Sequence, residues 1–362
     1  MPRFVKWPSR TCGRTTEQDR ERIVNNSPHF LQPASVQSVM LRVLFALLPG
    51  IAVYVWFFGA AVLVQIVLAS VTALAAEAAM LRLRGKPVLM FLGDGSALVT
   101  AWLIALTFPP IAPWWLTVVG VLTAIVIAKH LYGGLGQNPF NPAMVAFALM
   151  IVSYPTLMSQ WPAAGFTDFL PQWNAIFGAR QLDAITMATP LDALRTALHN
   201  ADARATVAGV LGSEATFGNI GGKGWEWVAA GYFLGGAYLL QQRIITWHMP
   251  VAFLATLFAI SGAFSIYDAT RFAGPGFHLF AGGAMLGAFF IVTDPVSGCT
   301  TPRGKLIFAA GIALLTWIIR TFGAYPDGIA FAVLLMNIAA PLIDMYTQPP
   351  VFGHKGKGGS SR

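Results

Sequence analysis

Residues 142–150 read PAMVAFALM, and residues 326–336 read PDGIAFAVLLM. Each run begins with proline and continues as an apolar helix, so the two look like copies of one element in two halves of the chain. Residues 94–100 (DGSALVT) and 294–300 (DPVSGCT) form a second, fainter pair of the same kind. Chance similarity between apolar helices is the alternative explanation. The two pairs indicate an internal repeat.

The composition is that of a membrane protein. Hydrophobic residues make up 56% and charged residues 10% of the 362 residues, whereas soluble domains contain ~45–50% and ~25%. The net charge of +8 fits Lys and Arg placed in cytoplasmic segments, so we expect no nucleic-acid partner. A membrane-spanning helix needs about 20 apolar residues, and about ten candidate spans can be placed. They lie near 39–57, 60–81, 95–109, 112–129, 142–155, 225–241, 244–264, 277–293, 304–320 and 327–344.

An odd number of spans in each half inverts the second half relative to the first. We therefore predict an all-α polytopic membrane protein with about ten transmembrane helices, arranged as two inverted five-helix repeats in which some helices are broken. The predicted parts are a cytoplasmic N-terminal arm, a first membrane repeat, a polar loop insertion, a second membrane repeat and a flexible cytoplasmic tail. The N-terminal arm covers 1–38, the first membrane repeat 39–155, the loop insertion 156–223, the second membrane repeat 224–346 and the tail 347–362.

The placement of Lys and Arg predicts the orientation. The N-terminal arm is basic, and the turn after the second span carries Arg82, Arg84 and Lys86. Both termini are therefore expected inside and the insertion outside. Arg320, at the outer end of the ninth span, is an exception that we expect to be solvated at the interface. The same solvation is expected of the other charged residues at span ends, namely Lys129, His130, Asp268, Arg271 and Asp344. Four tryptophans fit aromatic belts at the membrane interfaces, namely Trp114, Trp115, Trp225 and Trp227.

The insertion contains the run DAITMAT at residues 183–189. A threonine hydroxyl is a poor nucleophile by itself, so a separate enzyme would have to modify it. Pro190 favours an extended backbone at Thr189, which is easier for such an enzyme to bind. The run has the form Asp-x-x-Ser/Thr-x-Ala-Thr and resembles the site at which a flavin transferase esterifies the phosphate of FMN onto the last threonine. The residues that match this motif are Asp183, Thr186, Ala188 and Thr189.

Asp94 and Ser96 precede a short apolar run that ends at Phe108. About 14 helical residues span roughly 21 Å, which is short for a full crossing. A half-helix whose N-terminus points at an anion or a flavin ring is one interpretation. An interfacial N-cap is the other, because Asp and Ser both cap helices well.

Two further segments interrupt the helical pattern. Asp294, Ser297 and Thr300 repeat part of the threonine motif, but Cys299 stands where the motif has Ala. We interpret this segment as a helix break whose polar groups could line a cofactor or ion site. Residues 133–142 read GGLGQNPFNP. No Gly-Lys-Ser/Thr follows, so a phosphate loop is excluded, and broken backbone inside a bundle typically lines a cavity.

Four motifs together carry a family resemblance. They are GDGSA at 93–97, YGGLGQNPFNP at 132–142, TDPVS at 293–297 and YPDGIAFAVLLMN at 325–337. The chain resembles the RnfD/NqrB family from about residue 35 to residue 354, and it is more similar to the RnfD subunits of Rnf electron-transport complexes.

This resemblance implies a bacterial inner-membrane complex that moves electrons between ferredoxin and NAD and couples them to Na⁺ or H⁺ translocation. It implies covalent FMN on Thr189 on the periplasmic side and a second, non-covalent flavin such as riboflavin among the helices. The chain would not be active alone. Its implied partners are the lipid bilayer, a flavin transferase, iron–sulfur subunits, two small membrane subunits and a second subunit with covalent FMN.

Three alternatives remain open at the level of sequence. The chain could be the NqrB-type subunit of a sodium-pumping quinone reductase, a stand-alone channel or secondary transporter with inverted repeats, or a structural scaffold. The transporter hypothesis leaves Thr189 unmodified, so a flavin spectrum separates it from the redox hypothesis. The sequence does not indicate which residues would hold a non-covalent flavin.

Overall fold

The computed structural model describes residues 35–178, 185–199, 205–213, 216–325 and 327–349. The chain divides into residues 1–35 and 36–362, and every element below belongs to the second unit. Asp183 of the predicted attachment motif, most of the predicted N-terminal arm and most of the tail lie outside the described residues.

The first half of the membrane region is helical. Its elements are α2 (Val36–Phe58), α3 (Ala61–Leu83), α4 (Val88–Leu92), α5 (Ser96–Thr107), α6 (Trp114–Leu122), the π-helix η1 (Thr123–His130) and α7 (Pro142–Ser153). The second half contains α12 (Trp225–Gln241), α13 (His248–Tyr267), α14 (Pro275–Phe280), α15 (Ala284–Leu286), the π-helix η2 (Gly287–Ile291), α16 (Pro302–Phe322) and α17 (Ile329–Thr347).

Helices of membrane-spanning length confirm the prediction of a multi-pass membrane protein. Within the described residues, 5 helices are long and apolar enough to cross a membrane, namely α2, α3, α13, α16 and α17. Shorter apolar helices cover 96–107, 114–130 and 142–153. Each predicted span coincides with one helix or with a broken series of helices. The number of crossings, the inversion of the repeat and the domain boundaries stay predictions.

The predicted breaks fall between helices. Gly95 has a φ of 78°, a left-handed conformation that suits glycine, directly before α5 begins. In the second half, a short turn at 281–283 separates α14 from α15. This turn interrupts the predicted span 277–293 and was not predicted from the sequence.

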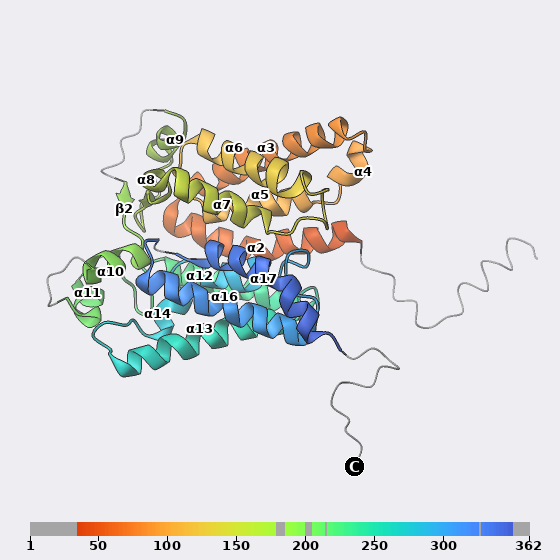
Figure 1. Ribbon diagram of the computed structural model, residues 1–362. Helices are drawn as coiled ribbons and strands as arrows, with labels where there is room; N and C mark the ends of the chain where they lie inside the picture. Colours follow the sequence, from red (N-terminus) through yellow and green to blue (C-terminus); the bar gives the residue numbers. More distant parts are fainter. Residues whose placement is uncertain (1–34, 179–184, 200–204, 214–215, 326, 350–362) are drawn as a thin grey trace, which may run out of the picture. The chain divides into compact units, whose positions relative to one another are not determined.

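The two halves pack together through α2 and α12, with α7 against α17 (Figure 1). Small residues bring the backbones of α2 and α12 close. A Cβ atom built on Gly235 would lie 1.8 Å from the carbonyl oxygen of Ala46. Small residues at a helix–helix contact allow such close approach in membrane proteins. Cavities between the two halves therefore depend on this contact.

The insertion forms short elements that gather at one end of the helices (Figure 1). They are α8 (Pro155–Met158), β1 (Trp161–Pro162), α9 (Phe169–Phe177), β2 (Thr186–Met187), α10 (Pro190–His199) and α11 (Val207–Ser213). The insertion, which was predicted only as a polar loop, also contains one short antiparallel pair, β1 with β2, in which Trp161 lies opposite Met187. Pairing satisfies backbone groups in segments that proline keeps from being helical.

Candidate functional site

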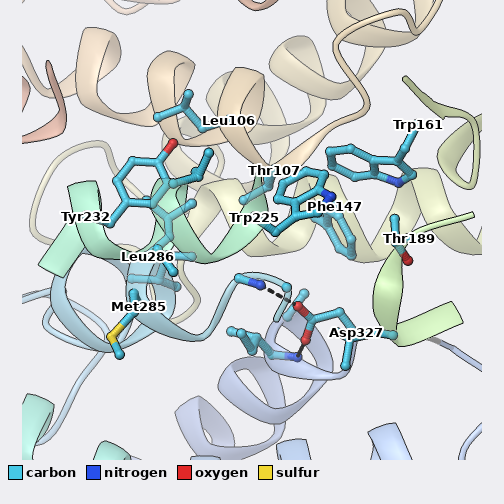
Figure 2. A pocket seen from close by; sticks show the side chains of 18 of the residues that line it. Leu106, Thr107, Phe147, Trp161, Thr189, Trp225, Tyr232, Met285, Leu286 and Asp327 are labelled. Carbon is cyan, nitrogen blue, oxygen red and sulfur yellow. Dashed lines mark hydrogen bonds between the residues drawn. The ribbon is translucent and has the colours of Figure 1, made fainter. Parts of the chain in front are cut away.

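One cavity lies between the two halves and reaches Thr189, and we call it the Thr189 cavity. It encloses about 1030 Å³ of empty space, part of it open solvent. Figure 2 shows the side chains around it. Both halves and the insertion contribute to its wall, through residues that include Tyr54, Thr107, Phe147, Trp161, Thr189, Trp225, Tyr232, Met285 and Asp327.

Thr189 stands between β2 and α10 and caps the helix. Its Oγ1 accepts a hydrogen bond from the backbone N–H of Asp192 at 3.3 Å, and its carbonyl oxygen accepts one from the N–H of Ala193 at 2.8 Å. Pro190 occupies the first helical position, where proline is favoured. The predicted non-helical backbone at Thr189 is confirmed. Thr189 is half-buried and Ala188 before it is exposed, so a modifying enzyme could reach this segment.

Aromatic rings form much of the wall of the Thr189 cavity. The ring centroids of Trp161 and Trp225 are 5.3 Å apart, and Trp225 also contacts Phe58 at 4.6 Å and Tyr54 at 5.6 Å. Trp225, which the sequence assigned to an aromatic belt, is half-buried and packs on these rings. The pairing of β1 with β2 brings Trp161 to the same cavity as Thr189.

Asp327 lines this cavity and forms an ion pair with the buried Arg320. Arg320 has a side chain that is 1% exposed and lies 3.2 Å from Asp327. It also donates to the carbonyl oxygen of His278 at 2.7 Å. Asp327 accepts a further hydrogen bond from the N–H of Gly283 at 3.0 Å. The expectation that Arg320 is solvated at the interface is wrong, since Asp327 supplies the opposite charge inside the protein.

A second cavity lies near the other end of α2, and we call it the Ser96 cavity. Met40 of α2 lines it, whereas Tyr54 lines the Thr189 cavity. A separation of 14 helical residues corresponds to about 21 Å along the axis. Polar side chains from both halves line the Ser96 cavity, including Ser96, Thr100, Lys129, Asn138, Asn141, Thr293 and Asp294.

The structure brings together two of the five candidate residues in the helix breaks. Ser96 and Asp294 line the same cavity, although they are far apart in sequence. Asp94 accepts hydrogen bonds from the N–H of Ser96 at 2.7 Å and from its Oγ at 2.6 Å. Asp94 thus accepts from the first N–H of α5, as the capping interpretation predicted. Asp94 does not line the cavity itself, but it holds the Ser96 side chain that does.

The other two candidates lie outside the lining of the cavity. Ser297 donates to Asp294 at 2.7 Å, which makes the predicted local turn. Thr300 donates from its N–H and its Oγ to Asp344, each at 2.8 Å, beside the start of α16. Ser297 supports a lining residue, and Thr300 belongs to a separate contact between α17 and the turn before α16.

The Gly-rich run lines the Ser96 cavity, as expected for broken backbone in a bundle. Asn138 and Asn141 are both buried there. Asn141 caps α7 by accepting from the N–H of Ala143 at 3.1 Å. Asn138 donates to the carbonyl oxygen of Phe140 at 2.9 Å. Each amide keeps hydrogen-bonding groups for a bound molecule, because an Asn side chain has two donors and two acceptor lone pairs.

Sequence reasoning missed Glu77. It is 3% exposed and lies within 2.7 Å of Lys129, which is 2% exposed. The expectation that Lys129 and His130 are solvated at a span end is wrong, because Glu77 pairs with both from α3. The signal was present in the sequence, since Glu77 is the one acidic residue in the apolar run of α3.

Asp268 and Arg271, at the end of α13, fit the expectation that charged residues at span ends are solvated at the interface. Their side chains are 31% and 81% exposed, and they form an ion pair at 3.8 Å. Hydrogen bonds from the side chain and backbone of Thr270, together with the charge of Arg271, hold the pKa of Asp268 below its ordinary value. This carboxylate belongs to the surface and not to either cavity.

Comparison with known proteins assigns the family. A model described as the NQR2, RnfD, RnfE family matches residues 23–353. The chain belongs to this family. Its match includes both cavities and the insertion.

Several relatives are named as the D subunit of an ion-translocating oxidoreductase complex. The protein of that name from Alcanivorax borkumensis is 48% identical over 334 residues, which is 92% of this chain and 97% of the relative. The one from Pseudomonas paraeruginosa is 50% identical over 332 residues, covering 91% and 95%. The one from Citrobacter koseri is 46% identical over 349 residues, covering 92% and 99%.

Proposed function

We propose that the chain is the flavin-bearing D subunit of an ion-translocating oxidoreductase complex. It matches relatives of that name along nearly their whole length, and it is a multi-pass membrane protein. The complex would move electrons between ferredoxin and NAD and couple them to Na⁺ or H⁺ translocation. The chain would work with iron–sulfur subunits, small membrane subunits and a second flavoprotein.

One observation carries the redox role, namely that the candidate threonine stands at an aromatic cavity. Thr189 follows an exposed, non-helical segment and lines the same space as Trp161 and Trp225. Aromatic side chains stack on flat ring systems, and pockets for such molecules are mostly apolar. The residues present therefore fit FMN held by a phosphoester on Thr189. When bound, FMN would accept and pass on electrons.

The Ser96 cavity fits a second, non-covalent flavin. Ser96, Asn138 and Asn141 present hydroxyl and amide groups, which suit the carbonyl and N–H edge of a flavin ring. Asp94 would act by fixing the Ser96 hydroxyl, and Asp294 would face the cavity from the second half.

The proposal puts the complex in the bacterial inner membrane with both termini in the cytoplasm. The insertion and Thr189 would then face the periplasm. Support comes from the basic N-terminal arm and the basic turn after α3, because cytoplasmic loops are enriched in Lys and Arg.

Mass spectrometry of the chain, purified from a host that has the flavin transferase, tests the proposal. We expect an added FMN mass on the peptide that carries Thr189, absent after Thr189→Ala. Thr216→Ala is the matched control, because Thr216 lies in the same small cleft as Thr189. An unmodified Thr189 would overturn the proposal and favour a stand-alone channel or transporter. FMN on the Thr300 peptide would overturn both the site and the orientation.

A further inference from the structure

In the first half of the molecule, buried side chains that have no role in the proposed flavin sites contact Ser96 of the second proposed site. The Lys129 Nζ donates to the two carboxylate oxygens of Glu77 at 2.8 and 2.7 Å and to the Ser96 Oγ at 2.8 Å. The three side chains belong to residues that are at most 5% exposed. Lys129 and Ser96 also line the Ser96 cavity, so this end of the cluster opens into it.

The other end of the cluster reaches the surface. The His130 Nε2 lies 3.6 Å from the nearer Glu77 oxygen, and the His130 Nδ1 lies 3.4 Å from an Arg84 nitrogen. His130 is 4% exposed. Arg84 is exposed and donates to the carbonyl oxygen of Gly133 at 2.9 Å. The contacts therefore lead from a solvent-exposed turn to the cavity wall, and one of them, from the His130 Nε2 to Glu77, is longer than a hydrogen bond.

The types of residue in this cluster favour proton transfer over a purely structural role. Burying an ion pair recovers little net stability, and ionisable groups at membrane depth are functional candidates by default. Glu, His and Lys can each gain and lose a proton, whereas Arg cannot. The charged groups that face Glu77 are Lys129 and His130 on η1. Arg84 lies one contact further away through His130, and Asp94 lies two contacts further away through Lys129 and Ser96.

We propose that His130, Glu77 and Lys129 form a proton-transfer path from the exposed turn at Arg84 to the Ser96 cavity. The proposal rests on the proposed function in one respect, because the proton acceptor is the flavin bound in that cavity. Asp94 holds the Ser96 hydroxyl and so positions the cavity end of the path.

The transfer balances without a further reactant. The Lys129 ammonium gives a proton to the acceptor, directly or across the Ser96 hydroxyl. The neutral Lys129 amine then takes a proton from the Glu77 carboxyl group, which His130 has protonated from its Nε2. His130 takes up a proton from water at Nδ1 when the Arg84 guanidinium, which lies 3.4 Å from that nitrogen and cannot release a proton itself, moves aside. One proton moves from water to the cavity, only N–H and O–H bonds change, and no electron moves along the path.

The test uses the full chain with Thr189→Ala in lipid nanodiscs, so that only non-covalent flavin remains. Reduced methyl viologen supplies electrons without protons. A pH indicator follows proton uptake in weak buffer while absorbance follows flavin reduction. The variants are Glu77→Gln and the double variant Glu77→Gln/Lys129→Met, which leaves no unpaired buried charge if the single change prevents folding. Asp268→Asn is the control, because that carboxylate lies on the surface away from the path.

We expect proton uptake to slow about 100-fold in both variants, the size of a typical general acid–base contribution. The Asp268→Asn control should take up protons at the parental rate, and rates are compared per bound flavin because Lys129 lines the cavity. Proton uptake at the parental rate in a double variant that retains flavin would overturn the proposed proton path and leave the proposed second flavin standing. If acid extraction finds no flavin in the parental chain, the second-flavin part of the proposed function is overturned together with the acceptor, so the two failures are distinguishable.

Discussion

The Thr189 cavity and the Ser96 cavity lie near opposite ends of α2 and differ in what their walls offer. Aromatic and aliphatic side chains dominate the first, and no Lys or Arg is among its described lining residues. The second presents Lys129, Asn138 and Asn141. A covalent bond from Thr189 would attach FMN there. Amide and hydroxyl groups can hold an uncharged flavin ring without one.

Thr189→Ala has the largest expected effect on this contrast. In the assembled complex it should abolish ferredoxin-to-NAD electron transfer, because the covalent FMN is lost. The change also removes the N-cap of α10, which costs about 1 kcal/mol of stability. Electron-transfer assays on intact complexes check the prediction.

Thr189→Ser separates the two roles of Thr189, since serine keeps the cap. Its stability should match the parental chain. Electron transfer that survives Thr189→Ala in an assembled complex would contradict a redox role for the Thr189 cavity.

Lys129→Met should be the most destabilising single change at the Ser96 cavity. It leaves the buried Glu77 carboxylate without its lysine partner and with only the longer contact to His130, and breaking a buried pair costs about 3–5 kcal/mol. Thermal unfolding in detergent measures the loss. Adding Glu77→Gln should recover most of the stability, and a single variant as stable as the double would show that the pair is not buried in the folded protein.

Gly235→Ala should damage both cavities, because both lie between the two halves. Its Cβ would meet the Ala46 carbonyl oxygen, and such overpacking costs about 1–3 kcal/mol. We expect less non-covalent flavin and less FMN attachment together. Gly212→Ala on α11 is the matched control, since a Cβ there meets open space. Loss of one flavin without the other would contradict a shared dependence on the contact of α2 with α12.

Asn138→Ala should have the smallest effect and should act on one cavity only. Loss of a hydrogen bond of about 1.4 kcal/mol weakens binding about tenfold. Flavin titration of the Thr189→Ala chain measures this, with the exposed Gln137→Ala as control. Equal weakening by both changes would argue that Asn138 does not contact the flavin.

Local patterns in the sequence predicted much of this fold. Pro142 and Asn141 mark the start of α7, and Gly95 marks the break before α5, because capping and glycine conformations depend on a few neighbouring residues. The pairing of Trp161 with Met187 was not predictable in this way, since a two-residue ladder depends on segments far apart in the chain.

For the candidate sites, too, local motifs were predictable from the sequence and contacts between distant helices were not. Motif reasoning proposed Thr189, Ser96 and Asp294 as site residues, and the last two do line one cavity. It misjudged Lys129 and Arg320, because position at a span end predicts solvation unless a partner from another helix is known. Glu77 and Asp327 are those partners.

Acid precipitation of the purified chain tests the contrast between the cavities most directly. Flavin is measured separately in the protein pellet and in the supernatant. We predict one FMN per chain in the pellet, lost on Thr189→Ala, and one flavin without a covalent bond in the supernatant, unaffected by that change. Flavin found only in the supernatant, or none in either fraction, would contradict the account.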